Sequence, residues 1–309
     1  MATHEAVGET LELAQTERGV LARAWSGLLR FIRRKPLGAV AALILIVLFV
    51  VAASPSTFAP NTYEEIDLHN RLKGPTLEHV FGSDKSGRDV FSRVLFGART
   101  SVSIGFAAVT VAAVLSSLVG ISSGYYGGKW DLSVQRFVDI VQAFPGLIFI
   151  IFLFSIFNQA VPGSLASQVV LALTLGFLFS AGSSRVVRSQ TISTVQNTYV
   201  EAARVVGATN WRIMVRHVFP NVFTVIIINI SVQLGAVILI ESALSFLGYG
   251  VPPPYPSWGR MLQEAQEDMQ LHPYLAFFPG FAIALSVYAL NMFGDALRDV
   301  LDPRLRGTE

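Results

Sequence analysis

Apolar stretches alternate with polar segments along almost the whole chain. Six stretches come close to the length of about 20 residues that a helix needs to cross a bilayer. They are residues 37–53, 102–121, 134–157, 167–183, 222–240 and 274–293. This pattern predicts an all-α membrane protein with six transmembrane helices. The third stretch contains the break Ala143-Phe144-Pro145-Gly146.

The longest polar insertion in the second half of the chain is YVEAARVVGATNWRIMVRHVFPN, residues 199–221. We predict a first short helix from Val195 to Val206, favoured by Ala202 and Ala203 because alanine has the highest helix propensity. Gly207 fits the position after its end, where a residue in the left-handed conformation stops a helix.

A second short helix should follow the glycine. Thr209 or Asn210 can cap its first turn, and Pro220 ends this helix or opens the next one. Such a unit between two membrane spans either packs the base of its own protein or is gripped by another protein. A DNA-reading helix-turn-helix is the alternative for GATNWR, and the flanking spans argue against it.

The polar segment 54–99 precedes the second apolar stretch. Asp84 or Ser86 can cap a helix here, and we expect that helix to lie at the outer membrane interface. One face of it would be apolar, through Val90, Phe91, Val94 and Leu95. The other faces would carry Arg88, Asp89 and Arg93.

Basic residues predict the orientation of the spans. The tail 1–36 ends with Arg30, Arg33, Arg34 and Lys35, and should therefore be cytoplasmic. The basic segment 195–220, four spans later, should be cytoplasmic too, as should the C-terminal tail 301–309. Residues 246–273 would be external. Residues 54–99 are an exception to the rule that basic residues mark cytoplasmic loops. They would be external but carry six basic residues, matched by six acidic ones.

Composition supports a membrane protein and narrows its chemistry. The 309 residues are 52% hydrophobic and 14% charged, and their net charge of +2 indicates no nucleic-acid partner. There is no cysteine, hence no thiolate metal site. GYYGGKW (124–130) lacks the spacing and hydroxyl residue of a phosphate-binding loop. We therefore expect no cofactor on this chain, and any ATP should be bound by a partner.

Several stretches resemble one family. Glu201-Ala202-Ala203 followed by Gly207 and Pro220 resembles the EAA loop of ABC-importer permeases. FGSDKSGRDVFSRVLFGARTS, LSFLGYGVPPPYPSWGRML and FFPGFAIALSVYALNMFGDALRDVLDPRLRG resemble the C-type permease subunits of peptide/nickel ABC importers. His217 departs from the β-branched apolar residue that the family often has there.

The resemblance implies a type I ABC-importer permease fold, with a core at residues 100–300. It also implies that the loop 195–220 docks in a cleft of an ATPase, with two alanines allowing close approach. The residues it assigns to this coupling are Glu201, Ala202, Ala203, Arg204, Gly207, Ala208, Arg212 and Pro220.

The partners implied by the resemblance are a second permease chain, two subunits that bind ATP and Mg²⁺, an extracytoplasmic binding protein and membrane lipid. The location would be the cytoplasmic membrane of a prokaryote, and this chain would hydrolyse no ATP itself. The implied cargo is a dipeptide or oligopeptide, with nickel or glutathione as alternatives. A transporter driven by an ion gradient should show inverted repeats and broken helices, and the sequence indicates neither.

Four polar residues in or near the spans are candidates for the pathway or its gate. Glu241 could meet the amino group of a peptide, although an ion pair holding the outer gate is favoured. Asp139 should pair with Arg136 or Arg185. Gln233 and Asn291 either face the pathway or, preferably, form hydrogen bonds between helices. Trp258 should anchor the external loop at the membrane interface.

Overall fold

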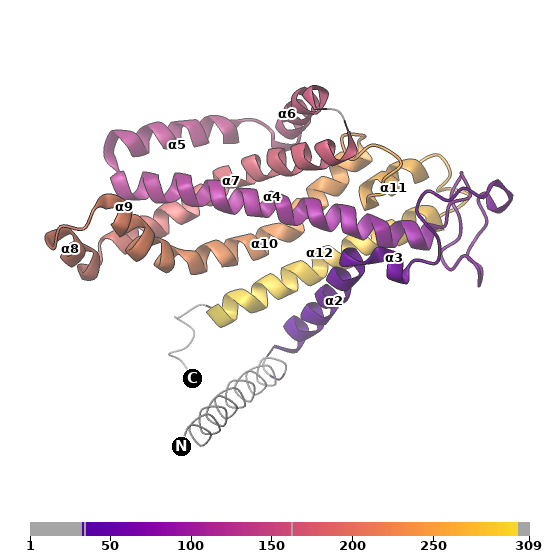
Figure 1. Ribbon diagram of the computed structural model, residues 1–309, viewed down its shortest axis with the longest axis horizontal. Coiled ribbons are helices and arrows are strands. Elements are labelled where there is room, and N and C mark those ends of the chain that lie inside the picture. The colour runs from indigo at the N-terminus through magenta and orange to yellow at the C-terminus, as the bar shows by residue number, and fades with distance from the viewer. Residues whose placement is uncertain (1–32, 34, 162, 302–309) are drawn as a thin grey trace, which may run out of the picture.

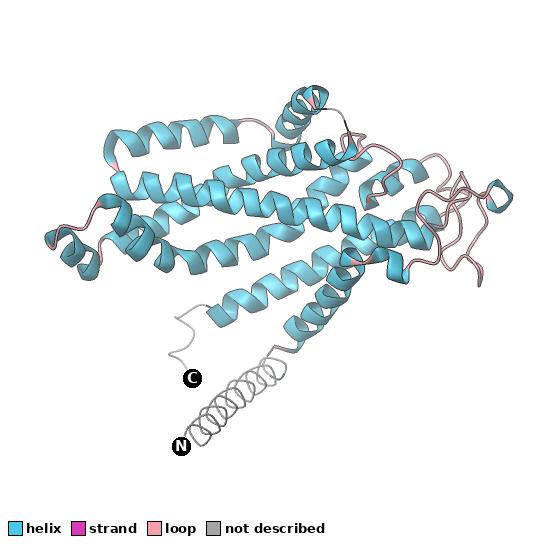
Figure 2. Ribbon diagram, in the orientation of Figure 1, coloured by secondary structure: helices cyan, strands magenta, loops and turns pink. Residues whose placement is uncertain are grey.

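The computed structural model describes residues 33, 35–161 and 163–301, so the expectations for the tails 1–32 and 302–309 lie outside the described residues. Figure 2 shows helices joined by loops, with no strand in the part of the chain that it describes. The helices are α2 (Pro36–Ala53), α3 (Pro55–Phe58), α4 (Val90–Tyr126), α5 (Gly128–Ala143), α6 (Gly146–Ala160), α7 (Ser164–Val195), α8 (Thr198–Val205), α9 (Asn210–Ile213), α10 (Phe219–Phe246), α11 (Trp258–Ala265) and α12 (Tyr274–Leu301).

Five helical stretches are long and apolar enough to cross a membrane: α2, α4, α7, the stretch from α9 through α10, and α12. A sixth span results if the bent pair α5 and α6 is counted as one. The predicted all-α membrane architecture is therefore confirmed.

The third span is broken rather than continuous. The axes of α5 and α6 differ by 95° across a short gap. Phe144 is extended (φ −81°, ψ 141°) because the ring of Pro145 disfavours helical geometry in the residue before it. The break seen in the sequence at residues 143–146 therefore lies at this bend.

α4 and α7 form the most closely packed pair of helices, and they lie alongside each other in Figure 1. Small residues on the facing sides allow the backbones to approach. A Cβ atom on Gly176 of α7 would lie 2.7 Å from the carbonyl oxygen of Ala108 in α4, and one on Gly120 of α4 would lie 2.6 Å from that of Ser184. Gly124, one turn after Gly120 on α4, lies in the same seam, where an added Cβ would be 2.8 Å from Thr191 of α7.

This seam should not tolerate even one added methyl group. Gly176→Ala should destabilise the fold by about 1–3 kcal/mol, because the new Cβ would overlap Val111 and Ala108. Gly182→Ala is the matched control, since its Cβ would meet only the flexible end of Gln142 at 3.4 Å. Thermal unfolding in detergent measures both, and equal midpoints would contradict the packing of this seam.

The second span differs from its prediction. We expected a separate interfacial helix within residues 54–99, capped by Asp84 or Ser86. Instead α4 begins at Val90 and runs unbroken for 37 residues, and its N-terminal cap is Asp89, whose carboxylate accepts from the backbone N–H of Ser92 at 2.8 Å. The turns assigned to an interfacial helix are therefore the first turns of the span itself.

Trp258 opens α11 and is buried, with 1% of its surface exposed. Its indole N–H donates to the carbonyl oxygen of Val94 at 3.0 Å, and its ring lies against Gly97. The expected role at the membrane interface was wrong, because this indole joins α11 to α4 within the protein.

The spans place the two groups of polar segments at opposite ends of the bundle. In Figure 1, α8 and α9 lie at one end, and α11 with residues 54–89 at the other. The ammonium of Lys35, just before α2, lies 2.6 Å from the Asp299 carboxylate near the end of α12. The first span therefore begins on the side where the last one ends.

We predict that the end bearing α11 is external. Gln270→Cys should react with an impermeant thiol reagent added outside intact cells, and Lys129→Cys, at the start of α5, should not. Both positions are exposed, and no native cysteine interferes. Labelling of residue 129 alone would reverse this topology.

Candidate functional site

Residues 198–218 join α7 to α10 and are here called the coupling segment, after the role that the resemblance to the EAA loop implies. The segment comprises α8, a turn, α9 and a single π-helical stretch, Met214–Val218, that continues into α10. The first helix begins three residues later than predicted because α7 itself extends to Val195. The backbone and side-chain N–H groups of Asn197 then donate to the carbonyl oxygen of Thr194 and close α7.

Gly207 makes the sharp turn between α8 and α9. Its φ of +83° is in the left-handed region, as predicted. The N–H of Gly207 donates to the carbonyl of Arg204, and that of Ala208 to the carbonyl of Ala203, both at 3.0 Å. These are the two hydrogen bonds of a Schellman motif, which fixes the direction in which the chain leaves a helix.

The second half of the segment begins at a capped turn. The Thr209 hydroxyl accepts from the N–H of Arg212 at 3.4 Å, which identifies Thr209 rather than Asn210 as the cap. Pro220 lies in the first turn of α10, directly after the π-helical stretch. A proline ring clashes with the carbonyl four residues earlier, and the wider π turn relieves this crowding.

An apolar base supports the coupling segment. Val200, Ile213 and Val218 are fully buried against Ile121 of α4 and Val187 of α7. Of the two alanines expected to enter a cleft, only Ala202 is exposed. Ala203 packs on this base together with Ala208.

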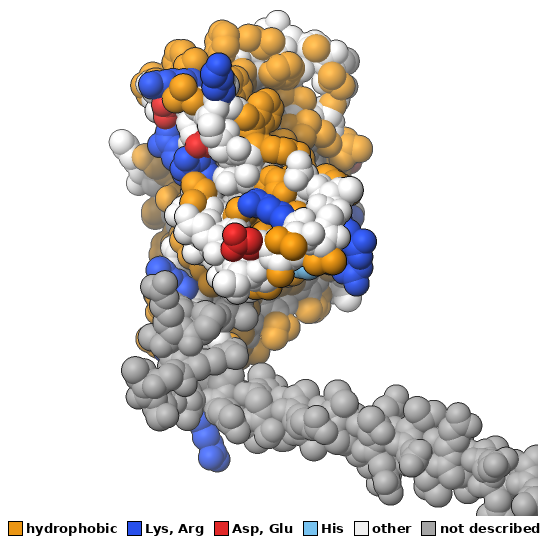
Figure 3. All heavy atoms as spheres, turned by 90° about the vertical axis from the view of Figure 1, so that its left-hand side faces the viewer, with side chains coloured by type: hydrophobic (Ala, Val, Ile, Leu, Met, Phe, Trp, Pro, Cys, Tyr) orange, Lys and Arg blue, Asp and Glu red, His pale blue; other side chains and the backbone are white. Residues whose placement is uncertain are grey.

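The outer surface of the coupling segment is basic and partly apolar. Val205 and Val206 are each 85% exposed and Trp211 is 70% exposed. Glu201, Arg204 and Arg212 are exposed as well. Figure 3 views this end of the bundle and shows Lys and Arg side chains interspersed with hydrophobic ones. Exposed valines on a capped, supported turn suit contact with another protein.

Tyr125, at the end of α4, contacts both halves of the coupling segment. Its hydroxyl donates to the Asn210 side-chain oxygen at 2.9 Å, and the Arg204 guanidinium lies 5.4 Å from its ring centre. Nothing in the sequence singles out this residue, because GYYGG contains no periodic signal that would distinguish it.

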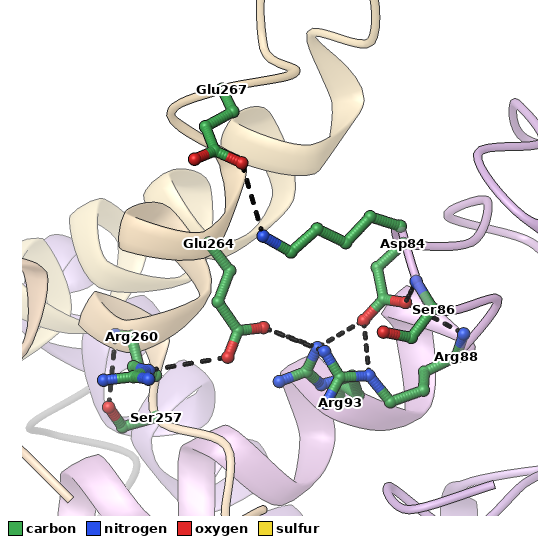
Figure 4. Close-up of polar contacts among 9 residues, drawn as sticks. Asp84, Ser86, Arg88, Arg93, Ser257, Arg260, Glu264 and Glu267 are labelled. Atoms are coloured by element: carbon green, nitrogen blue, oxygen red, sulfur yellow. Dashed lines mark hydrogen bonds and ion pairs between the residues drawn. The ribbon is translucent and has the colours of Figure 1, made fainter. Parts of the chain in front are cut away.

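The opposite end of the bundle holds a network of charged side chains (Figure 4). Arg93 of α4 is 3% exposed and lies between Asp84 and Glu264, at 2.9 Å from the latter. Arg88 contacts the same two carboxylates, at 2.7 Å from Asp84 and 3.0 Å from Glu264. Arg260 lies 3.5 Å from Glu264. The network therefore joins the start of α4 to α11.

These arginines determine the charge of the two shared carboxyls. Burial alone would raise the pKa of Asp84, but the charges of Arg93 and Arg88 and two backbone N–H donors outweigh it and lower that pKa. Burial would likewise raise the pKa of Glu264, but the charges of Arg93 and Arg88 outweigh burial and lower that pKa. Both groups are therefore ionised at neutral pH.

Glu241 of α10 is fully buried, and the expected ion pair was wrong. Within the described residues only hydroxyl groups contact its carboxyl: Ser245 at 2.8 Å, Ser242 at 3.4 Å and Ser101 of α4. The Ser101 hydroxyl also accepts from the N–H of Trp258. Glu241 thus links α10 to α4 and, through Ser101, to α11. It does not form the ion pair expected of a gate within the described residues.

The other three candidates make different contacts. Gln233 donates to the Ser183 hydroxyl of α7 at 2.5 Å, as an interhelical hydrogen bond. Asn291 is exposed and lines a groove of about 680 Å³ between α10, α11 and α12, and no hydrogen bond of its side chain is found within the described residues. Asp139 pairs with Arg185 and lies 3.7 Å from Arg136.

Comparison with known proteins adds a second kind of observation. Residues 116–307 match the family described as binding-protein-dependent transport system inner membrane component. The glutathione transport system permease protein GsiD of Escherichia coli O6:K15:H31 (strain 536 / UPEC) is 41% identical over 285 residues, as is that of Shigella boydii serotype 4 (strain Sb227). Each alignment covers 92% of this chain and 91% of the relative.

A solved structure described as an amino acid ABC transporter with histidines has a TM-score of 0.48 to this chain at 17% sequence identity. The structural alignment covers 70% of this chain and 94% of the chain in the solved structure. The family match includes the coupling segment and all helices from α5 to α12.

Proposed function

Because this chain belongs to the family of binding-protein-dependent transport system inner membrane components, we propose that it forms half of a peptide pathway in an ATP-driven importer. The chain is a multi-pass inner-membrane permease of the peptide/nickel ABC-importer type. The other half of the pathway would be a second permease chain. An extracytoplasmic binding protein would deliver the cargo, and two ATPase subunits would drive its passage.

Energy would enter through the coupling segment. The observation that supports this most is its form, a capped helical turn on its own apolar base with Val205 and Val206 85% exposed. Such a turn can sit in a cleft of another subunit without disturbing the spans behind it. Since its base is built from residues of α4, α7 and α10, the segment is in contact with three spans.

A short peptide is the proposed cargo. The relatives at 41% identity are named for glutathione, which is a tripeptide, and glutathione is therefore the first cargo to test on this chain. No residue of the described chain is assigned to it. Asn291, in the groove between α10 and α12, and Gln233 remain the polar pathway candidates.

The test is reconstitution of this chain with its partner permease, ATPases and binding protein in proteoliposomes. Uptake of labelled glutathione, a labelled dipeptide and Ni²⁺ into the vesicles is measured with and without ATP in the lumen, on the side of the membrane that carries the ATPases. We expect peptide uptake that requires ATP, and no ATP hydrolysis by the purified chain alone. Uptake driven by an ion gradient without ATP, or uptake of Ni²⁺ alone, would contradict the proposal.

A further inference from the structure

We propose that Tyr125 is a positioning residue that ties the coupling segment to α4, so that the segment moves as one body with the α4–α7 pair. This inference rests on the proposed coupling function and names the helices that receive the movement first.

One side chain contacts both sides of the Gly207 turn. Arg204, in the last turn of α8, places its guanidinium 5.4 Å from the centre of the Tyr125 ring. Asn210, the first residue of α9, accepts the Tyr125 hydroxyl at 2.9 Å. Tyr125 therefore holds the two short helices at a set angle to each other, in addition to the backbone geometry of Gly207.

The residue that makes these contacts is itself firmly placed. Tyr125 is half-buried and packs on the apolar base of the segment. The preceding residue, Gly124, lies in the α4–α7 seam, where an added Cβ would be 2.8 Å from Thr191 of α7. Tyr125 thus projects from the end of the most closely packed pair of helices.

The covalent link from the segment to α10 is irregular helix, unlike the side-chain contacts of Tyr125 with α8 and α9. It runs through the π-helical stretch Met214–Val218 and then Pro220, which has no N–H to donate. Short π stretches interrupt the regular hydrogen-bond ladder and are sites of bending. A displacement of the segment would therefore reach α4 through Tyr125 more directly than it reaches α10 along the chain.

The test is a double-mutant cycle in the full assembly. Tyr125→Phe removes the donor and Asn210→Leu removes the acceptor, and the two changes are also combined. Asn210→Asp keeps an acceptor oxygen in the same place. Tyr126→Phe is the matched control, because Tyr126 is exposed and its hydroxyl makes no hydrogen bond within the described residues. Hydrogen exchange of the α8 and α9 amides and the uptake per ATP hydrolysed are both measured.

We expect Tyr125→Phe and Asn210→Leu each to speed amide exchange in α8 and α9 by about two- to tenfold, the range that one lost hydrogen bond produces. Both should lower the uptake per ATP hydrolysed, with the double variant no worse than either single one. Asn210→Asp and Tyr126→Phe should behave like the unchanged protein. Exchange in α4 and α7 should not change in any variant.

Two results would overturn the inference: additive effects of the two changes, or unchanged exchange and coupling in Tyr125→Phe. Failure of the coupling function itself is recognised separately. In that case Gly207→Val would also transport normally with its ATPases bound, whereas a failure of the Tyr125 inference alone would leave Gly207→Val uncoupled.

Discussion

Replacing Gly207 by valine should abolish coupled uptake and leave the transmembrane bundle folded. With φ at +83°, a side chain that branches at Cβ strains the turn by about 1–2 kcal/mol. Apart from the two neighbouring residues, no atom of the described chain lies within 4 Å of the added Cβ, so the change acts on the backbone and not on packing. The turn should relax to another geometry and misplace Val205 and Val206 against the partner.

Gly207→Asn is the matched control for this change. Asparagine adopts the left-handed conformation more readily than other residues with a side chain, so most of the uptake should remain. Glu201→Lys should weaken docking less than Gly207→Val, because an exposed ion pair is worth about 0–1 kcal/mol.

Co-purification of the ATPases and uptake in proteoliposomes measure both effects. Normal transport by Gly207→Val, with its ATPases bound, would show that the segment is not the coupling element.

Replacing Arg93 by methionine should destabilise the protein by about 3–5 kcal/mol, the usual effect of breaking a buried ion pair. The change leaves Asp84 paired with Arg88, and Glu264 paired with Arg88 and, at 3.5 Å, with Arg260. It removes the buried guanidinium that lies between the two carboxylates. The start of α4 and α11 should then separate more easily.

Arg99→Met in the same helix is the control, because Arg99 is exposed and has no ion pair within the described residues. The midpoint of thermal unfolding should fall much further in Arg93→Met than in Arg99→Met. Equal midpoints would show that the network contributes nothing to stability.

The same network predicts how stability depends on pH. The pKa values of Asp84 and Glu264 are lower in the folded protein than their ordinary values of about 4. Their contribution is therefore fully present above about pH 4, and it is lost as the pH falls through the folded pKa values. Arg93→Met should lose less stability on acidification than the unchanged protein.

The apolar runs predicted the order of the spans, with α5 and α6 together in the place of the third, because the length of a hydrophobic stretch is a local property. They could not predict where α4 begins. Its first turns contain Arg93 and Asp89, which look like an interfacial helix in the sequence, and only the carboxylates from α11 and the preceding loop make burial of that arginine possible. Tertiary contact outweighed the local pattern.

In the coupling segment, too, local features could be predicted from the sequence and tertiary contacts could not. Gly207 and Thr209 were predictable because a left-handed turn and a helix cap depend on neighbouring residues. Tyr125 was not, since its hydrogen bond to Asn210 spans 85 positions of the sequence. Glu241 was predicted to form an ion pair because the sequence does not show that three serines, one of them in α4, surround its carboxyl group.

The charged network also has a consequence for the way the chain is made. Glu264 follows Arg93 by 171 residues, which takes a ribosome on the order of 10 s to translate. Throughout that interval the N-terminal end of α4 has Asp84 as an acidic partner and lacks Glu264. The network is therefore completed only once α11 has emerged, late in synthesis. Nascent chains arrested well beyond residue 265 should protect the peptide bonds around Arg88 from added protease, and chains arrested before residue 258 should not.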